Sequence, residues 1–117
     1  MATWDEAELA NEVLRELGIV GRGQTAGAED TEIVTTAFTS IYPQIRRQGL
    51  APWPAAAISE GAQQPLAKYV AGQVASRFGF SGPSLAEKKL IGEEGRIELQ
   101  EQAAGDKHTV TPKFKDY

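Results

Sequence analysis

The sequence predicts an all-α protein, a small bundle of about four helices with an extended C-terminal arm. Apolar residues recur every three or four positions in four separate stretches, which is the spacing of amphipathic helices. Segments rich in glycine or proline separate these stretches, and only the last stretch of the chain alternates as a strand would. At 117 residues the chain can form one domain with a modest core. We therefore predict a helical core over residues 1–104 and an arm over residues 105–117.

The first helix is expected to begin near Thr3 and to end at Gly18. Thr3 and Glu6 have the spacing of a capping box, in which the two side chains bond to each other's backbone N–H groups. Leu9, Val13 and Leu17 then recur every four residues. The glycine-rich segment that follows lacks periodicity and is predicted to be a loop.

The second helix is predicted over residues 31–47, capped by Asp30 or Thr31. Its apolar residues fall within one half of the helical wheel, the cleanest pattern in the chain. Pro43 lies on the polar face and is expected to bend the helix rather than end it. The residues of the apolar half are Ile33, Val34, Ala37, Phe38, Ile41, Tyr42 and Ile45.

The central helix of the bundle is predicted over residues 65–80, with Pro65 in its first turn and Gly79 at its end. One face is broadly apolar, and a second, narrow stripe contains Gly72 and Ser76, which would let another helix approach the backbone closely. The preceding segment is expected to be extended, because Trp53 stands between two prolines. Trp53 is either a core anchor or, if it is exposed, an interface anchor.

The last helix is predicted from Ser84 to about residue 103, and its apolar pattern is weak. One thin stripe, formed by Leu85, Leu90 and Ile97, is expected to pack on the core. A second stripe could contact a neighbouring subunit, although a loosely packed final helix would give the same pattern. The predicted subunit-interface residues are Gly72, Ser76, Ile91, Leu99 and Trp53.

Four glutamates project from one side of this last helix. They form either a solvated surface or a functional acidic face. As a functional face they would pair with Arg22, Arg46 or Arg47 of an adjacent subunit, or would line a channel through which a polyanion slides. The residues are Glu87, Glu94, Glu98 and Glu101.

The C-terminal stretch places Val110, Pro112 and Phe114 on one side of an alternating pattern. Pro112 excludes the stretch from the middle of a sheet, and the chain contains no other convincing strand. It is either a disordered tail or an arm that docks on another chain through Phe114 and Tyr117.

Catalytic chemistry finds little support in the sequence. The absence of cysteine excludes disulfides, thiolate metal sites and a cysteine nucleophile. His108 is the only histidine and has no partners nearby in the sequence for acid–base or metal chemistry. A pair of carboxylates could cleave glycosides, with Glu16 or Glu60 as candidates, but no pair stands out. We predict no enzyme activity, no cofactor and no metal.

Net charge and hydropathy bear on the class of partner. The formal net charge is −4 and the basic residues are scattered, which argues against a dedicated nucleic-acid surface. A small DNA-binding or packaging-associated protein remains the alternative, although the second helix offers only Gln44, Arg46 and Arg47, near its C-terminal end. No apolar run is long enough to span a bilayer, and the acidic N-terminus is unlike a signal peptide. These features predict an intracellular soluble protein without a membrane partner.

Three segments carry a resemblance to a known family: LGIVGRGQTAGAED at residues 17–30, GLAPWPAAAISEGAQQPLAKYVAGQVASRFGFSG at residues 49–82, and the terminal PKFKDY. Together they resemble the head-to-tail connector (adaptor) proteins of tailed bacteriophages, also called packaged-DNA stabilisation or head-completion proteins. The resemblance implies a helical subunit that assembles as a ring, expected to be dodecameric, beneath the portal after DNA packaging. The ring would close the capsid exit and offer a platform for the tail.

The resemblance also implies partners and a location. The partners would be other copies of the chain, the portal protein and a downstream tail or nozzle protein, while packaged DNA only passes through the channel. The protein would be assembled in the host cytoplasm and would reside in the virion at the head–tail junction. In such proteins the C-terminal extension reaches along the portal, which implies these portal-contact residues: Val110, Pro112, Lys113, Phe114, Lys115 and Tyr117.

Overall fold

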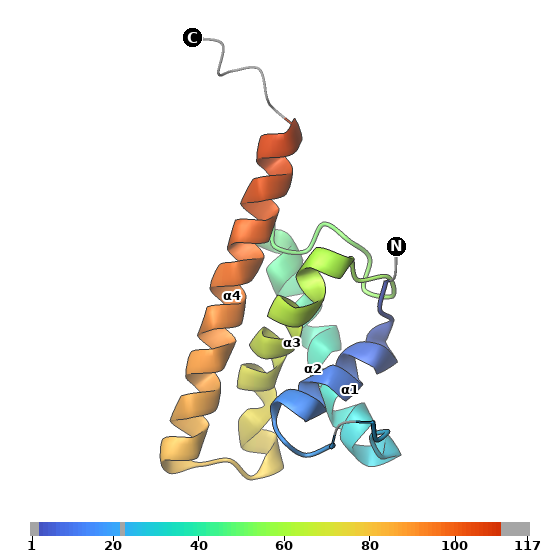
Figure 1. The fold of residues 1–117 in the computed structure, drawn as a ribbon, viewed down its shortest axis with the longest axis vertical. Coiled ribbons are helices and arrows are strands. Elements are labelled where there is room, and N and C mark those ends of the chain that lie inside the picture. Colours follow the sequence, from blue (N-terminus) through green and yellow to red (C-terminus); the bar gives the residue numbers. More distant parts are fainter. Residues whose placement is uncertain (1–2, 22, 111–117) are drawn as a thin grey trace.

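The computed structural model of the chain describes residues 3–21 and 23–110, with 105–110 described as helical backbone (Figure 1). Its elements are α1 (Glu6–Glu16), α2 (Ala28–Arg47), α3 (Glu60–Val74), the short 3₁₀ helix η1 (Ala75–Phe78) and α4 (Gly82–Val110). Within these residues the structure contains no strand, only one isolated antiparallel bridge between Trp4 and Ile58. The predicted all-α bundle is therefore confirmed.

Helix α3 is the central element of the bundle. It packs most extensively against α4 and also contacts α1 and α2 (Figure 1). α4 has 29 residues, which corresponds to a length of about 44 Å at 1.5 Å per residue. Its C-terminal end projects past the rest of the bundle (Figure 1). A compact three-helix unit therefore carries one long helix along its side.

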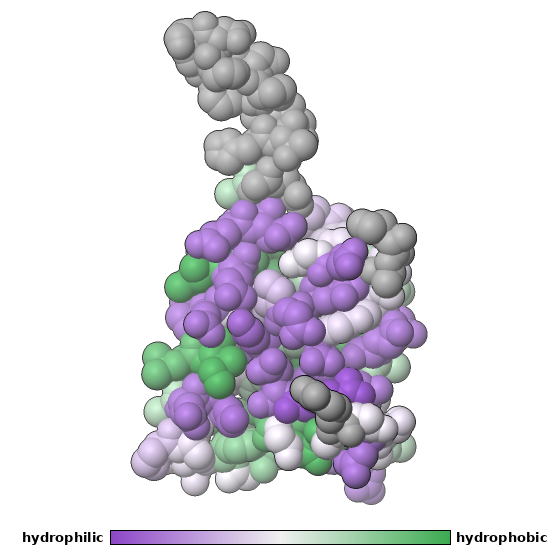
Figure 2. Space-filling view, in the orientation of Figure 1, coloured by the Kyte–Doolittle hydropathy of each residue, from purple (hydrophilic) through white to green (hydrophobic). Residues whose placement is uncertain are grey.

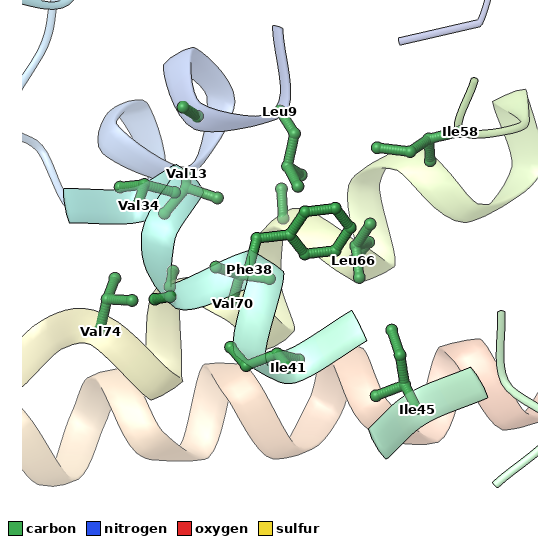
Figure 3. Close-up of a cluster of buried hydrophobic side chains, with 14 of the residues drawn as sticks. Leu9, Val13, Val34, Phe38, Ile41, Ile45, Ile58, Leu66, Val70 and Val74 are labelled. Atoms are coloured by element: carbon green, nitrogen blue, oxygen red, sulfur yellow. The ribbon is translucent and has the colours of Figure 1, made fainter. Parts of the chain in front are cut away.

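The core is formed where α1, α2 and α3 meet. Phe38 of α2 lies at its centre, with Leu9 of α1 and Leu66 of α3 around it (Figure 3). The apolar faces predicted for the first three helices are largely buried, as expected from their periodicity. The largest fully buried side chains are Phe38, Leu9, Leu14, Ile45, Ile58, Leu66, Leu99, Val13, Val34, Val70 and Val74.

The first helix begins at Glu6 rather than near Thr3. Asp5 is its N-cap: the Asp5 Oδ1 atom accepts a hydrogen bond from the Glu8 backbone N–H at 2.8 Å, and Glu8 Oε1 accepts one from the Asp5 N–H at 2.9 Å. The predicted Thr3–Glu6 capping box does not form, because Trp4 exchanges two backbone hydrogen bonds with Ile58 and is held extended. A capping box is present, two residues further along the chain.

Replacing Asp5 by alanine is expected to lower the free energy of unfolding by about 1 kcal/mol, because the Glu8 backbone N–H at the start of α1 loses its side-chain acceptor. Urea denaturation followed by circular dichroism measures the change. Thr3→Ala is the matched control and is expected to leave the stability unchanged. A larger loss for Thr3→Ala than for Asp5→Ala would contradict the observed helix start.

The second and third helices also begin earlier than predicted. α2 begins at Ala28 with Gly27 as its N-cap, so neither Asp30 nor Thr31 caps it. Asp30 instead lies in the first turn, where a carboxylate interacts favourably with the helix dipole. Pro43 lies inside α2 and does not end it, as predicted.

α3 begins at Glu60, so Pro65 lies inside the helix and not in its first turn. A proline near the beginning of a helix removes a single backbone hydrogen bond there, which the rest of α3 tolerates. α3 ends at Val74 and is followed by η1, which ends at Phe78, so the α-helix ends earlier than the predicted residue 80. Gly79, the predicted stop, caps η1, and its φ of +90° favours glycine.

The last helix is longer than predicted at both ends. It begins at Gly82 rather than Ser84 and continues to Val110, well past residue 103. The segment 105–110 is therefore helical, whereas the sequence predicted an extended arm from residue 105. The remainder of the predicted arm, residues 111–117, lies outside the described residues.

Candidate functional site

The layer formed by α3 and α4 holds most of the predicted interface residues, and its two helices touch backbone to backbone. A Cβ atom added to Gly72 of α3 would lie 2.8 Å from the Gly92 Cα of α4, and one added to Gly95 would lie 2.5 Å from the Pro65 carbonyl oxygen. The small-residue stripe does admit a close helix, but that helix is α4 of the same chain. Gly72 is consequently buried against α4.

The two apolar stripes predicted for α4 do not correspond to an inward and an outward face. Leu99, predicted to face a neighbour, is only 1% exposed and belongs to the core, whereas Leu90 and Ile97 are 72% and 44% exposed. Leu85 and Ile91 are half-buried. The inward face of α4 contains Gly92 and Gly95, which add no hydrophobicity to the pattern, so the outward pair Leu90 and Ile97 gave the stronger signal.

Trp53 anchors the core rather than an interface. It is 7% exposed, and its carbonyl oxygen accepts a hydrogen bond of 2.6 Å from the Tyr42 hydroxyl. The Tyr42 hydroxyl in turn accepts one of 2.7 Å from Arg46 Nη1. Of the predicted interface set, only exposed Ser76 in η1 and half-buried Ile91 reach the surface.

The acidic flank of α4, defined as Glu87, Glu94, Glu98 and Glu101, lies along one side of the helix beside α3. Lys68 of α3 places its Nζ atom 3.4 Å from Glu98 Oε1 and 3.9 Å from Glu94 Oε1. Glu87 and Glu101 are exposed, and the Glu94 side chain is still 63% exposed. One lysine therefore pairs with two of the four carboxylates, and the flank keeps a negative surface.

The other side of α4 carries a basic flank, defined as Lys89 and Arg96. Arg96 donates hydrogen bonds to the Glu93 carboxylate, one of them from Nε at 2.7 Å. This hydrogen bond lowers the pKa of Glu93 and raises that of Arg96. This flank was not predicted from the sequence, although Lys89 and Arg96 have the same seven-residue spacing as Glu87 and Glu94.

A shallow groove of about 200 Å³ lies between α3 and α4 on the basic side. It follows from the glycine contact, since neither Gly72 nor Gly92 has a side chain to fill the space. The residues that line it are Tyr69, Gly72, Gln73, Lys89, Gly92 and Glu93. Figure 2 shows hydrophobic surface among hydrophilic residues along the edge of the molecule formed by α4.

The candidate catalytic residues do not come together as a reactive site. Glu16 borders an open depression of about 360 Å³, which is also lined by Glu12 and Arg15. The Arg15 Nη1 and Glu12 Oε1 atoms form an ion pair at 3.1 Å. Glu60 lies elsewhere, in the exposed first turn of α3. No cluster of three or more acidic, histidine or cysteine residues that could hold a metal ion occurs among the described residues. His108 lies in the part of α4 for which only backbone is described.

The remaining predicted residues bear on DNA, membrane and portal contacts. Gln44, Arg46 and Arg47 lie at the C-terminal end of α2, and Arg46 is engaged by Tyr42. Within residues 3–21 and 23–110, no helix is long and apolar enough to cross a membrane. Val110 is the last residue of α4. The other portal-contact candidates, Pro112, Lys113, Phe114, Lys115 and Tyr117, and also Arg22, lie outside the described residues.

In comparisons with known proteins, no family model, no curated protein and no solved structure matches this chain. The functional interpretation therefore depends on the residues, on their arrangement and on the resemblance described above.

Proposed function

We propose that this chain is a head-to-tail adaptor of a tailed bacteriophage, which assembles as a ring beneath the portal, closes the capsid exit after DNA packaging and provides the attachment platform for the tail. The observation that carries the proposal is the projection of α4 past the bundle to Val110 (Figure 1). The chain continues from this point with TPKFKDY, the segment that the resemblance assigns to the portal.

The arrangement of α4 suits such a role. Its first two thirds are held by the close contact with α3 and by the buried side chain of Leu99. The rest of the helix leads away from the core, so a partner can bind the C-terminal segment without unfolding the bundle. Phe114 and Tyr117 in that segment are aromatic residues of the kind that dominate binding energy at interfaces.

The proposal is tested by mixing the purified chain with rings of the portal protein encoded with it, and by measuring mass and symmetry by light scattering and negative-stain imaging. We expect the full chain to decorate the portal as a ring and a chain lacking residues 111–117 not to do so. The double variant Phe114→Ala/Tyr117→Ala is expected to weaken binding by about 30-fold or more, since two aromatic anchors are lost.

The matched control is Lys113→Ala/Lys115→Ala, which removes two long side chains of the same segment but no aromatic ring. Its effect is expected to be smaller and to diminish further at high salt. Thermal unfolding by circular dichroism should be the same for all variants, because every changed residue follows Val110, the last residue of α4, in the sequence. A full chain that forms no complex with the portal, but binds duplex DNA in a salt-dependent manner, would refute the adaptor function and favour the DNA-binding alternative.

A further inference from the structure

The α3–α4 layer has two lateral sides of different charge: four glutamates with Lys68 on one side, and Lys89 and Arg96 with the Glu93 carboxylate on the other. The acidic flank lies on the side of Lys68, and the basic flank lies on the side of Tyr69 together with the groove. Leu90 and Ile97, defined as the outer ridge, point away from α3 between the two flanks. Neither flank takes part in the portal contact proposed above, so both are free for another partner.

The two flanks share one axial period. Glu87, Glu94 and Glu101 are separated by seven residues, as are Lys89 and Arg96, and seven residues span about 10.5 Å of helix. Each basic residue follows an acidic one by two positions, which is about 3 Å along the axis. In two copies of α4 placed side by side at the same height, Lys89 is therefore offset by only about 3 Å along the axis from Glu87 of the neighbour, and Arg96 by the same amount from Glu94. These long side chains can span that offset.

We propose that copies of this chain pack side by side in the same orientation, with the acidic flank of one α4 against the basic flank of the next. Lys89 pairs with Glu87 of the next copy, and Arg96, which hydrogen-bonds to Glu93 of its own chain, also interacts with Glu94 of the next copy. This inference rests on the proposed function in one respect: the contact is taken to be the one between neighbouring copies in the proposed ring.

Ile91 gives this contact an apolar centre. It is half-buried on the acidic side of α4. Along the helix axis its height is midway between those of Lys89 and Glu93, which line the groove on the other side. In the side-by-side arrangement Ile91 of one copy faces the groove of its neighbour at the same height. The groove volume of about 200 Å³, compared with about 30 Å³ for a water molecule, accommodates a branched aliphatic side chain.

The charges also determine the orientation and the kind of symmetry. An antiparallel neighbour would place acidic flank against acidic flank, or basic against basic, and like charges at such a contact are strongly unfavourable. Parallel copies meet through two different surfaces, which is a heterologous contact. Without displacement along the helix axis, such contacts close into a ring when the rotation between neighbouring copies divides a full turn.

The experiment uses charge reversal in the full chain. Lys89→Glu/Arg96→Glu makes both flanks acidic, and Glu87→Lys/Glu94→Lys reverses the charge at the two positions of the acidic flank that the proposal pairs. Each variant alone is expected to associate about tenfold more weakly, or worse, than the wild type, in sedimentation velocity and in ring formation on the portal. An equimolar mixture of the two variants, and the quadruple variant, restore complementary flanks and are expected to recover association. The inference would be overturned if the single-flank variants lost association, neither the mixture nor the quadruple variant recovered it, and circular dichroism showed that all variants were folded.

A second pair of variants tests the apolar centre. Ile91→Ser is expected to weaken association, whereas Leu90→Ser on the outer ridge is the matched control and should retain it. The opposite result would show that the outer ridge forms the contact, and would refute the proposed contact between the two flanks.

If the wild type decorates the portal and charge reversal changes nothing, this interface is wrong while the adaptor function stands. If free copies show the charge-swap behaviour but do not bind the portal, the interface stands and the adaptor function fails.

Discussion

Replacing Leu99 by alanine is expected to lower the free energy of unfolding by about 2–5 kcal/mol, the range for removal of a buried leucine side chain. Leu99 is 1% exposed and belongs to the hydrophobic core. Its truncation leaves a cavity that the closely packed α3–α4 contact cannot collapse to fill. Urea denaturation monitored by circular dichroism measures the loss through the midpoint at constant slope.

Leu90→Ala is the control for this measurement. The Leu90 side chain is 72% exposed, so its truncation is expected to change the stability by no more than about 0.5 kcal/mol. Equal losses for the two variants, or a larger loss for Leu90→Ala, would contradict the assignment of the inward and outward faces of α4. Because the two residues share one helix and one side-chain type, their difference reports burial alone.

The sequence predicted the first two helices and most of the core for a clear physical reason. In α2 the buried residues Val34, Phe38, Ile41 and Ile45 are large and recur at helical spacing, so amphipathicity alone identifies the buried face. The start of α3 was misplaced because Pro65 is typical of a first helical turn, whereas here the helix extends back to Glu60. Local sequence cannot show that the surrounding bundle accepts a proline inside α3.

The α4 surface was harder to predict because its packing depends on residues without side chains. Gly92 and Gly95 lie at the contact with α3, and glycine carries no signal in a hydrophobic pattern. The acidic row was visible in the sequence from its spacing. Its partner Lys68, and the groove on the opposite side, depend on how two helices meet and could be found only in the folded structure.

The glycine contact between α3 and α4, together with the core of the first three helices, explains how a short chain can present several separate surfaces. The close glycine contact lets α4 lie against α3 without using large side chains, so its flanks and outer ridge stay exposed. The core of the other three helices supplies the stability that such an exposed helix does not provide by itself. A subunit of a ring needs this separation, because the contacts with neighbours must not compete with its own core.

Replacing Gly95 by alanine is expected to lower the free energy of unfolding by about 2–3 kcal/mol, even though alanine favours a helix over glycine by about 1 kcal/mol. The added Cβ would lie 2.5 Å from the Pro65 carbonyl oxygen and 2.8 Å from the Tyr69 backbone nitrogen. Both of these atoms belong to the backbone of α3, so the two helices must move apart. Thermal and urea unfolding of the variant measure the cost.

Gly61→Ala provides the matched comparison within the same pair of helices. Its added Cβ would meet only the end of the Gln102 side chain, which can turn away. This variant is therefore expected to be as stable as the wild type or slightly more stable, following helix propensity. If Gly95→Ala were also neutral or stabilising, the backbone contact between α3 and α4 would be looser than the structure indicates. The groove beside that contact, which is proposed to receive Ile91 of a neighbour, would then lose its structural basis.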